Sequence, residues 1–179
     1  TAVDIETGFI NWQLPTQSSS IINETYNFKA SELVSDGNSI FFSNNKNQFY
    51  SIDLKTGATN WINNVNSSIQ PILVGKLIFT ISNEGYLYVI DKFKGNILRI
   101  TDLFLNYKTK KRKKIYPIGF VIGDKNLFLT NSDGKIIVVR IEDGKIIKIE
   151  KVSGGLVSKP FIFNNNLYVV RNGSIVQYN

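Results

Sequence analysis

A short motif returns four times along this chain, and each copy ends in a glycine. The two clearest copies are Val3-Asp4-Ile5-Glu6-Thr7-Gly8 and Ile52-Asp53-Leu54-Lys55-Thr56-Gly57, and in both a tryptophan follows the glycine by four residues. Looser copies surround Asp91 and Glu142, so that the four glycines stand 49, 38 and 49 residues apart. A period of about 40 residues that contains only short strands is typical of propeller blades. The positions that recur are Asp4, Gly8, Trp12, Asp53, Gly57, Trp61, Asp91, Gly95 and Gly144.

Each repeat is expected to hold four strands. In the second unit these lie near 32–34, 39–42, 48–53 and Trp61, with Asp36-Gly37-Asn38 as one of the turns. Turns of this type tolerate positive φ and are a strong hairpin signal. We therefore expect an all-β fold, a β-propeller of four-stranded antiparallel blades, with four blades in this chain. We expect a single domain whose blade units are approximately 13–62, 63–100, 101–149 and 150–179, with 1–12 as the remaining outer strand.

The chain begins and ends at the same phase of the repeat. Asn179 aligns with Asp4, Asp53 and Asp91, so the last unit lacks the outer strand that the first residues provide. Propellers remove exposed sheet edges by closing into a ring. Two arrangements fit this phase: the four blades close on themselves, or they form half of an eight-bladed ring. A half-ring predicts a homodimer in which each N-terminal strand completes the last blade of the other copy.

The absent residue types exclude several kinds of chemistry. The chain has no histidine and no cysteine, which rules out a Ser-His-Asp triad, a disulfide and a thiolate site. No tight cluster of Asp, Glu, Lys, Tyr and Ser stands out, and no calcium-ligand set or glycine-rich phosphate loop is recognisable. We therefore expect no catalytic, metal-binding or cofactor-binding residues. Glu142-Asp143 are interpreted as turn residues rather than an acid-base pair, and the recurring aspartates as caps of backbone N–H groups.

Most of the net positive charge comes from one segment. Of the 21 basic residues six lie between 108 and 114, and the remaining 15 nearly balance the 14 acidic residues. Because like charges repel each other, we expect this insertion to be an exposed, mobile loop. Its positive charge favours contact with an acidic protein surface or with anionic lipid headgroups. Binding of nucleic acid is disfavoured, although its charge would allow it, because the only aromatic residues near the segment are Tyr107 and Tyr116. The candidate contact residues are Lys108, Lys110, Lys111, Arg112, Lys113 and Lys114.

Targeting signals are not evident in the sequence. No run of 18 apolar residues occurs, and the first residues have neither the basic start nor the apolar run of a signal peptide. A precursor could have lost such a signal by processing. The polar stretch 15–29 is expected to be a surface connection between strands.

The repeat resembles the pyrroloquinoline-quinone-type β-propeller repeat, in which a blade reads roughly Asp-Gly, Leu-Tyr-Ala-Leu-Asp, Thr-Gly and then Trp. The similar segments here are Leu87-Tyr88-Val89-Ile90-Asp91 with its following glycine, and Ser51-Ile52-Asp53 with its Thr-Gly and tryptophan. The likeness weakens where Arg140 replaces the aspartate and where Arg99 and Lys148 replace the tryptophan.

The resemblance implies a structural role for the tryptophans and a function for the protein. Trp12 and Trp61 would pack between adjacent blades. The family is quinoprotein-like and contains both quinone-dependent dehydrogenases and non-enzymatic relatives. The dehydrogenases use a catalytic aspartate, calcium ligands and often adjacent cysteines. Among the non-enzymatic relatives, the chain is most similar to the eight-bladed propeller lipoprotein subunit of the bacterial outer-membrane β-barrel assembly machinery.

That likeness implies a non-catalytic protein-interaction scaffold that needs no cofactor. It would act in the periplasm, tethered to the outer membrane in the full-length protein, and its partners would be outer-membrane barrel assembly components. The alternatives are a fragment of a pyrroloquinoline-quinone-dependent dehydrogenase, whose active residues lie in other blades, and a domain that organises a larger protein.

Overall fold

The computed structural model describes residues 1–16, 29–44, 46–152 and 154–178. The strands of these residues form five antiparallel sheets, and within each sheet the strands pair in chain order. The first sheet is an N-terminal hairpin of β1 (Ala2–Val3) and β2 (Ile10–Trp12). Most of the expected connection 15–29, and Asn179 with its alignment to the recurring aspartates, lie outside the described residues.

Three four-stranded sheets and one three-stranded sheet follow the hairpin. Blade I contains β3 (Val34–Ser35), β4 (Ser39–Asn44), β5 (Gln48–Asp53) and β6 (Thr59–Asn63). Blade II contains β7 (Ile72–Val74), β8 (Leu77–Ile81), β9 (Tyr86–Asp91) and β10 (Ile97–Asp102). Blade III contains β11 (Pro117–Gly123), β12 (Asn126–Asn131), β13 (Lys135–Arg140) and β14 (Ile146–Lys151). Blade IV contains β15 (Phe161–Phe163), β16 (Asn166–Arg171) and β17 (Ser174–Tyr178).

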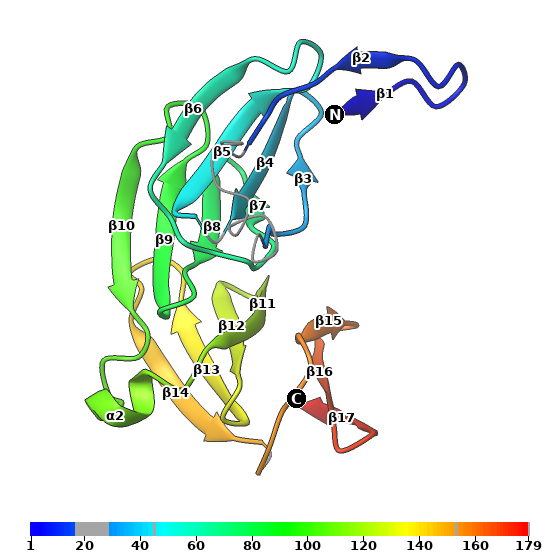
Figure 1. The fold of residues 1–179 in the computed structure, drawn as a ribbon. Coiled ribbons are helices and arrows are strands. Elements are labelled where there is room, and N and C mark those ends of the chain that lie inside the picture. The colour runs from blue at the N-terminus through cyan, green and yellow to red at the C-terminus, as the bar shows by residue number, and fades with distance from the viewer. Residues whose placement is uncertain (17–28, 45, 153, 179) are drawn as a thin grey trace.

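The sheets succeed one another along an arc (Figure 1). In the first three blades the first strand lies on the inner side of the arc and the fourth strand on its outer side. The hairpin and blade IV stand at opposite ends of the arc, and in the described residues no strand of one pairs with a strand of the other. The expected all-β fold of propeller blades is therefore confirmed, whereas a ring closed by these four blades alone is not what the structure shows.

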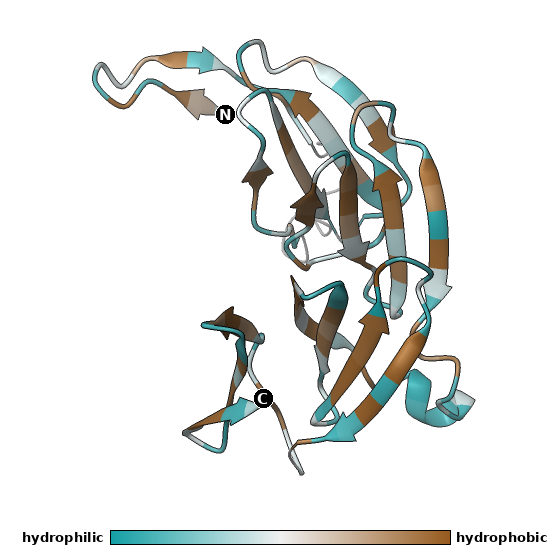
Figure 2. Cartoon of the chain, turned by 180° about the vertical axis from the view of Figure 1, so that it is seen from behind, coloured by the Kyte–Doolittle hydropathy of each residue, from teal (hydrophilic) through white to brown (hydrophobic). Residues whose placement is uncertain are grey.

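The core lies between the blades. One apolar cluster joins the facing sides of blades II and III and includes Phe79, Leu87, Phe120, Leu129 and Ile137, none more than 1% exposed. Smaller clusters join blade I to blade II and blade III to blade IV. Because the middle blades pack on both faces, their central strands are apolar almost throughout rather than alternating (Figure 2). Each blade thus depends on its neighbours for burial of its apolar surface.

Within the described residues, one short helix interrupts the strands. The helix α2 (Thr109–Arg112) lies in the connection from blade II to blade III and projects from the outer side of the arc (Figure 1). Within the described part of the chain, no helix has the length and apolar character that crossing a membrane requires.

Candidate functional site

The basic segment 108–114 is held against the blades at both ends. Leu103 and Phe104 before it and Ile115 after it are buried, and the Phe104 ring lies over the turn at Gly85 so closely that a Cβ there would approach it to 2.2 Å. Between these anchors the chain forms α2. The segment expected as a loop thus contains a helical turn, and apolar side chains on both of its flanks pack into the core between blades II and III.

Two of the six cations bind carboxylates of the blades. Arg112 Nη1 lies 2.7 Å from Asp102 Oδ2, and this hydrogen-bonded ion pair raises the pKa of the guanidinium. Lys111 Nζ lies 3.0 Å from Asp133 Oδ2 and 5.2 Å from the centre of the Tyr107 ring. These contacts fix the segment and leave Arg112 only 25% exposed. Lys111 and Arg112 therefore hold the segment against the blades in addition to contributing positive charge to the surface.

The other four cations of the segment point to solvent. They are Lys108, Lys110, Lys113 and Lys114, all exposed and without an ion pair in the described residues. Leu105, 72% exposed, and Tyr116, 50% exposed, flank them. These four exposed lysines, beside exposed apolar side chains, form a positively charged surface, which we call the lysine patch.

A repeated turn connects the third and fourth strands of blades I, II and III, and also connects β1 to β2 of the hairpin; we call it the outer turn. In blade I, Asp53 Oδ1 accepts hydrogen bonds from Lys55 N at 3.0 Å and Thr56 N at 2.8 Å, which lowers the pKa of the carboxyl group. Gly57 N donates to Asp53 O at 3.0 Å, and Gly57 has a φ of 73°. Only glycine adopts such a φ without cost. The outer turns at Asp4 and Asp91 have the same carboxylate-capped geometry.

A side chain of β2, of β6 and of β10 reaches the outer turn of the following blade. In blade I, Trp61 Nε1 donates to Lys92 O at 3.1 Å. Its ring stacks on Phe49 at 5.8 Å and covers Gly95, where a Cβ would meet Trp61 Cδ2 at 2.6 Å. We call this arrangement, a fourth-strand side chain over the outer-turn glycine and hydrogen-bonded to the turn, the inter-blade lock.

The lock recurs between the hairpin and blade I, and, with an arginine in place of the tryptophan, between blades II and III. Trp12 of the hairpin donates through Nε1 to Leu54 O at 3.1 Å. In blade II the corresponding residue is Arg99, whose Nη2 donates to Ile141 O and whose Nη1 donates to Glu142 O, both at 2.6 Å. The sequence showed Arg99 only as a departure from the repeat, although its place in the repeat could have indicated this role.

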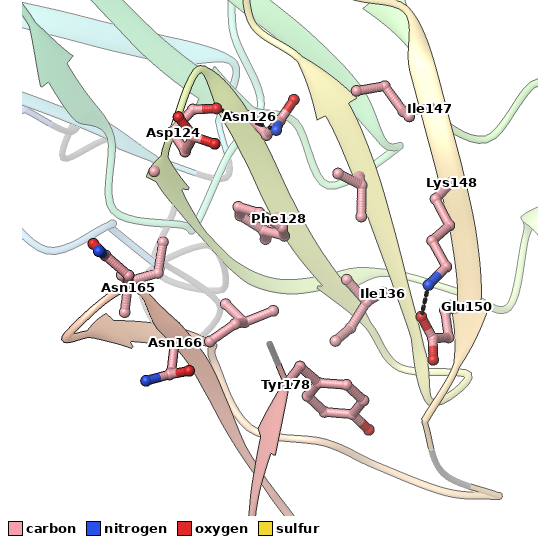
Figure 3. Close-up of a pocket in the computed structure, with 14 residues that line it drawn as sticks. Asp124, Asn126, Phe128, Ile136, Ile147, Lys148, Glu150, Asn165, Asn166 and Tyr178 are labelled. Atoms are coloured by element: carbon pink, nitrogen blue, oxygen red, sulfur yellow. Dashed lines mark hydrogen bonds and ion pairs between the residues drawn. The ribbon is translucent and has the colours of Figure 1, made fainter.

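A pocket of about 950 Å³ opens between blades III and IV (Figure 3). Phe128, Ile136 and Val138 of blade III form part of its wall, and Tyr178 lies at its blade IV side. Lys148 of β14 lines it as well and makes an ion pair of 2.6 Å with Glu150, two residues further along the same strand. The pocket therefore combines an apolar wall with a charged outer rim.

The described residues offer no metal centre. They contain no group of three or more Asp and Glu side chains that could hold a metal ion. Glu142 and Asp143 belong to the outer turn of blade III, where Asp143 Oδ2 pairs with Arg140 Nη1 at 2.9 Å and Asp143 Oδ1 caps Lys145 N. The carboxylate of Asp143 thus supports the turn in which both residues lie.

Solved structures share this fold. The crystal structure of BamB from Moraxella catarrhalis matches with a TM-score of 0.65 at 17% identity, over 82% of this chain and 41% of that chain. The computationally designed Ika4 protein matches with a TM-score of 0.68 at 13% identity, over 83% of this chain and 89% of that chain. The WD40 β-propeller domain of Doa1 matches with a TM-score of 0.62 at 11% identity, over 83% of this chain and 49% of that chain. The protein is thus of the β-propeller class.

The family is shown by the sequence itself. The family model described as "Outer membrane protein assembly factor BamB" matches residues 1–101, and the chain belongs to this family. The matched residues comprise the hairpin and almost all of blades I and II, where the repeat is clearest. The predicted resemblance is confirmed. The chain spans less than half the length of the Moraxella catarrhalis BamB that it matches, at 41%. No curated protein sequence matches it.

Proposed function

We propose that this chain is a non-catalytic scaffold that assists the assembly of β-barrel proteins into the outer membrane, as part of a periplasmic protein tethered to that membrane. The observation that carries the proposal is membership of the BamB family over residues 1–101. The inter-blade locks support it, because they join successive blades through backbone carbonyls and so give a rigid platform. A rigid platform presents its loops in fixed positions to a partner.

The lysine patch is the surface that we assign to a protein partner. Its four lysines lie in or beside a short helix that two ion pairs and buried flanking residues hold in place. Because the backbone that carries them is held in place, only the side chains lose conformational freedom on binding. Electrostatic complementarity with an acidic surface accelerates encounter and selects the partner. We infer that an acidic surface of a barrel-assembly component contacts Lys108, Lys110, Lys113 and Lys114.

A crosslinked pull-down of the full-length native protein from membrane extract, with mass spectrometry of the captured proteins, tests the function. Recovery of the barrel-assembly insertase is the expected result. Recovery of a cytochrome or another quinone-linked electron acceptor in its place would overturn the scaffold proposal in favour of the dehydrogenase alternative.

Charge reversal tests the patch. In the variant with all four lysines of the patch changed to Glu, we expect capture of the partner to fall at least tenfold at low ionic strength, and the loss to shrink as salt rises. The matched control changes four other exposed lysines, each in a turn away from the patch: Lys55, Lys76, Lys94 and Lys125. Equal loss of capture in both variants would show that net charge, and not this patch, attracts the partner.

A further inference from the structure

The outer edge of blade II is an apolar strand edge. β10 forms the outer side of this blade, and among the described residues no strand pairs with it on the side away from β9. Its exposed residues are Ile97, Leu98 and Ile100, at 40%, 58% and 53%. Blade II lies between blades I and III of the same chain, so this edge does not depend on what stands at either end of the arc (Figure 1). Unpaired backbone N–H and C=O groups beside apolar side chains are a template for a further strand.

The charged residues of β10 are already engaged within the protein. Arg99 donates to the carbonyls of Ile141 and Glu142 in the next blade. Asp102 accepts a hydrogen bond from Arg112. The strand contains no lysine and no proline, which are the residues that commonly protect a sheet edge from pairing. The edge of β10 is therefore unprotected.

The outer strands of blades I and III differ from β10 in this respect. In β14 of blade III four residues are exposed, and two of them are lysines, Lys148 and Lys151. In β6 of blade I three residues are exposed, and two of them are polar, Thr59 and Asn60. Of these three outer strands, only β10 exposes apolar side chains alone.

The C-terminal end of this edge leads to the lysine patch. Leu98, Ile100 and Asp102 alternate along β10 and therefore project from one face of the strand. Asp102 Oδ2 lies 2.7 Å from Arg112 Nη1 of α2, and α2 projects from the outer side of the arc beyond the end of β10 (Figure 1). An exposed apolar row and a positively charged surface thus follow one another in one direction.

We propose that β10 pairs with an extended segment of a partner protein, which adds a fifth strand to blade II and places acidic side chains on the lysine patch. This inference rests on the scaffold function proposed above and names the kind of partner. The segment alternates apolar and polar residues and carries acidic residues at one end. The strand pairs of blade II are antiparallel, so we assign the antiparallel direction, in which the acidic residues precede the apolar ones.

The two parts of the surface have separate roles in this pairing. Backbone hydrogen bonds along β10 supply affinity, and apolar side chains of the segment cover Leu98 and Ile100. The lysine patch selects a segment whose acidic end has the right direction. Salt screens exposed charges. The contribution of the acidic end should therefore fall as salt rises, while the pairing itself remains.

Fluorescence anisotropy on the purified full-length protein tests the pairing, with the labelled peptide Glu-Asp-Glu-Gly-Val-Thr-Val-Thr-Val-Thr as the probe. The double variant Leu98→Lys with Ile100→Lys should bind the peptide about tenfold more weakly, because lysine on an edge opposes pairing. Added lysines attract the acidic residues, so net charge cannot cause this loss.

The matched control is the double variant Ile147→Lys with Ile149→Lys. These residues flank Lys148 in β14 as Leu98 and Ile100 flank Arg99 in β10, and they are 50% and 36% exposed. The control adds the same charge and should bind the peptide as the unchanged protein does. Circular dichroism and urea unfolding check that both double variants are folded.

Two further peptides test the contact with the lysine patch. One has Gln in place of each acidic residue, and the other carries the acidic residues after the apolar stretch. Both should bind the unchanged protein more weakly than the first peptide at low salt, and the differences should shrink as salt rises. In the variant with the four patch lysines changed to Glu, the Gln peptide should bind more tightly than the acidic one.

A photoreactive group at the central valine of the first peptide locates the bound segment. Crosslinks in the tryptic fragments that contain β10 are the expected result. Crosslinks to other strands, equal binding by the two double variants, equal binding of the three peptides at low salt, or no binding by the unchanged protein would overturn the proposal. The pull-down outcome is separate: absence of peptide binding leaves the scaffold function standing, and recovery of a quinone-linked acceptor removes that function whatever the peptide affinity.

Discussion

Arg99 joins blade II to blade III by donating to the backbone carbonyl of Ile141 at 2.6 Å, in the place where a tryptophan joins the preceding blades. Arginine and tryptophan share an N–H donor at the end of a flat group. Both therefore cover a glycine turn and reach the carbonyl behind it. A guanidinium has more donors, and Arg99 uses a second one for Glu142 O at 2.6 Å.

We predict that Arg99→Ala lowers the free energy of unfolding by about 2 kcal/mol, because two hydrogen bonds to a charged donor are lost and two turn carbonyls lose their partner. Arg99→Trp should recover part of that loss, since a tryptophan fits the equivalent position of blade I. Urea unfolding followed by circular dichroism measures both. Arg140→Ala is the control: it removes an exposed ion pair with Asp143 and should cost no more than about 0.5 kcal/mol. Equal losses at both positions would contradict the lock.

Two turn glycines allow the stability cost of backbone strain to be measured separately from the cost of steric contact. Gly95 and Gly75 both have positive φ, 73° and 57°, but a Cβ at Gly95 would lie 2.6 Å from Trp61 Cδ2, whereas a Cβ at Gly75 would meet nothing within 4 Å. Gly75→Ala should therefore cost about 1 kcal/mol, from the left-handed backbone alone. Gly95→Ala should cost a further 1–3 kcal/mol or so because Trp61 must move. Tryptophan fluorescence should report that movement in Gly95→Ala only.

The strands were predictable because their ends are set by local chemistry. The expected bounds 48–53 are those of β5, since a turn precedes the strand and an aspartate that caps the next turn ends it. Long-range pairing of charges was not predictable. The basic segment showed only repulsion in the sequence, because Asp102 and Asp133, which bind Arg112 and Lys111, come from separate strands and turns.

The role of Arg99 was hidden for a related reason. A repeat identifies a position by the residue type that recurs there, and arginine is a different type from tryptophan, so the sequence marked the position of Arg99 but not its contact. Only the backbone carbonyls opposite, which have no sequence signature, make the two residues equivalent. The pocket beside Lys148 is likewise a property of two neighbouring blades, and neither blade's sequence alone reveals it.

Acid should weaken the contact between blades I and II. Asp36 Oδ2 lies 2.8 Å from Lys92 Nζ, and the hydrogen bond from Lys92, aided by those from Ser39 N and Asn38 N, lowers the pKa of Asp36 to about 2. A lowered pKa in the folded state means that this stabilisation is present above pH 3.8 and is lost as pH falls toward 2. Asp36→Asn should cost about 1–2 kcal/mol at pH 7 and should lose less stability than the unchanged protein between pH 5 and pH 2 or so. Identical acid dependence in the two proteins would contradict this account.

Alkali should weaken the anchoring of the basic segment through Tyr107. Its ring lies near the ammonium groups of Lys111 and Lys135, 5.2 and 4.9 Å from the ring centre. Burial, together with the negative charge of Asp133, raises the pKa of its hydroxyl from 10.0 to about 12. A raised pKa in the folded state means that the unfolded chain ionises first, so stability is full below pH 10 and falls as pH rises toward 12.

Tyr107→Phe removes the ionising group and keeps the ring that contacts the lysines. We expect it to unfold at nearly the same urea concentration as the unchanged protein at pH 8, and to lose less stability between pH 9 and pH 11 or so. Tyr116→Phe, at a half-exposed position on the other flank of the segment, is the matched control and should follow the unchanged protein at every pH. If Tyr107→Phe also follows the unchanged protein at every pH, then the pKa of the Tyr107 hydroxyl is the same in the folded protein and in the unfolded chain. That result would contradict the effect of burial on this pKa.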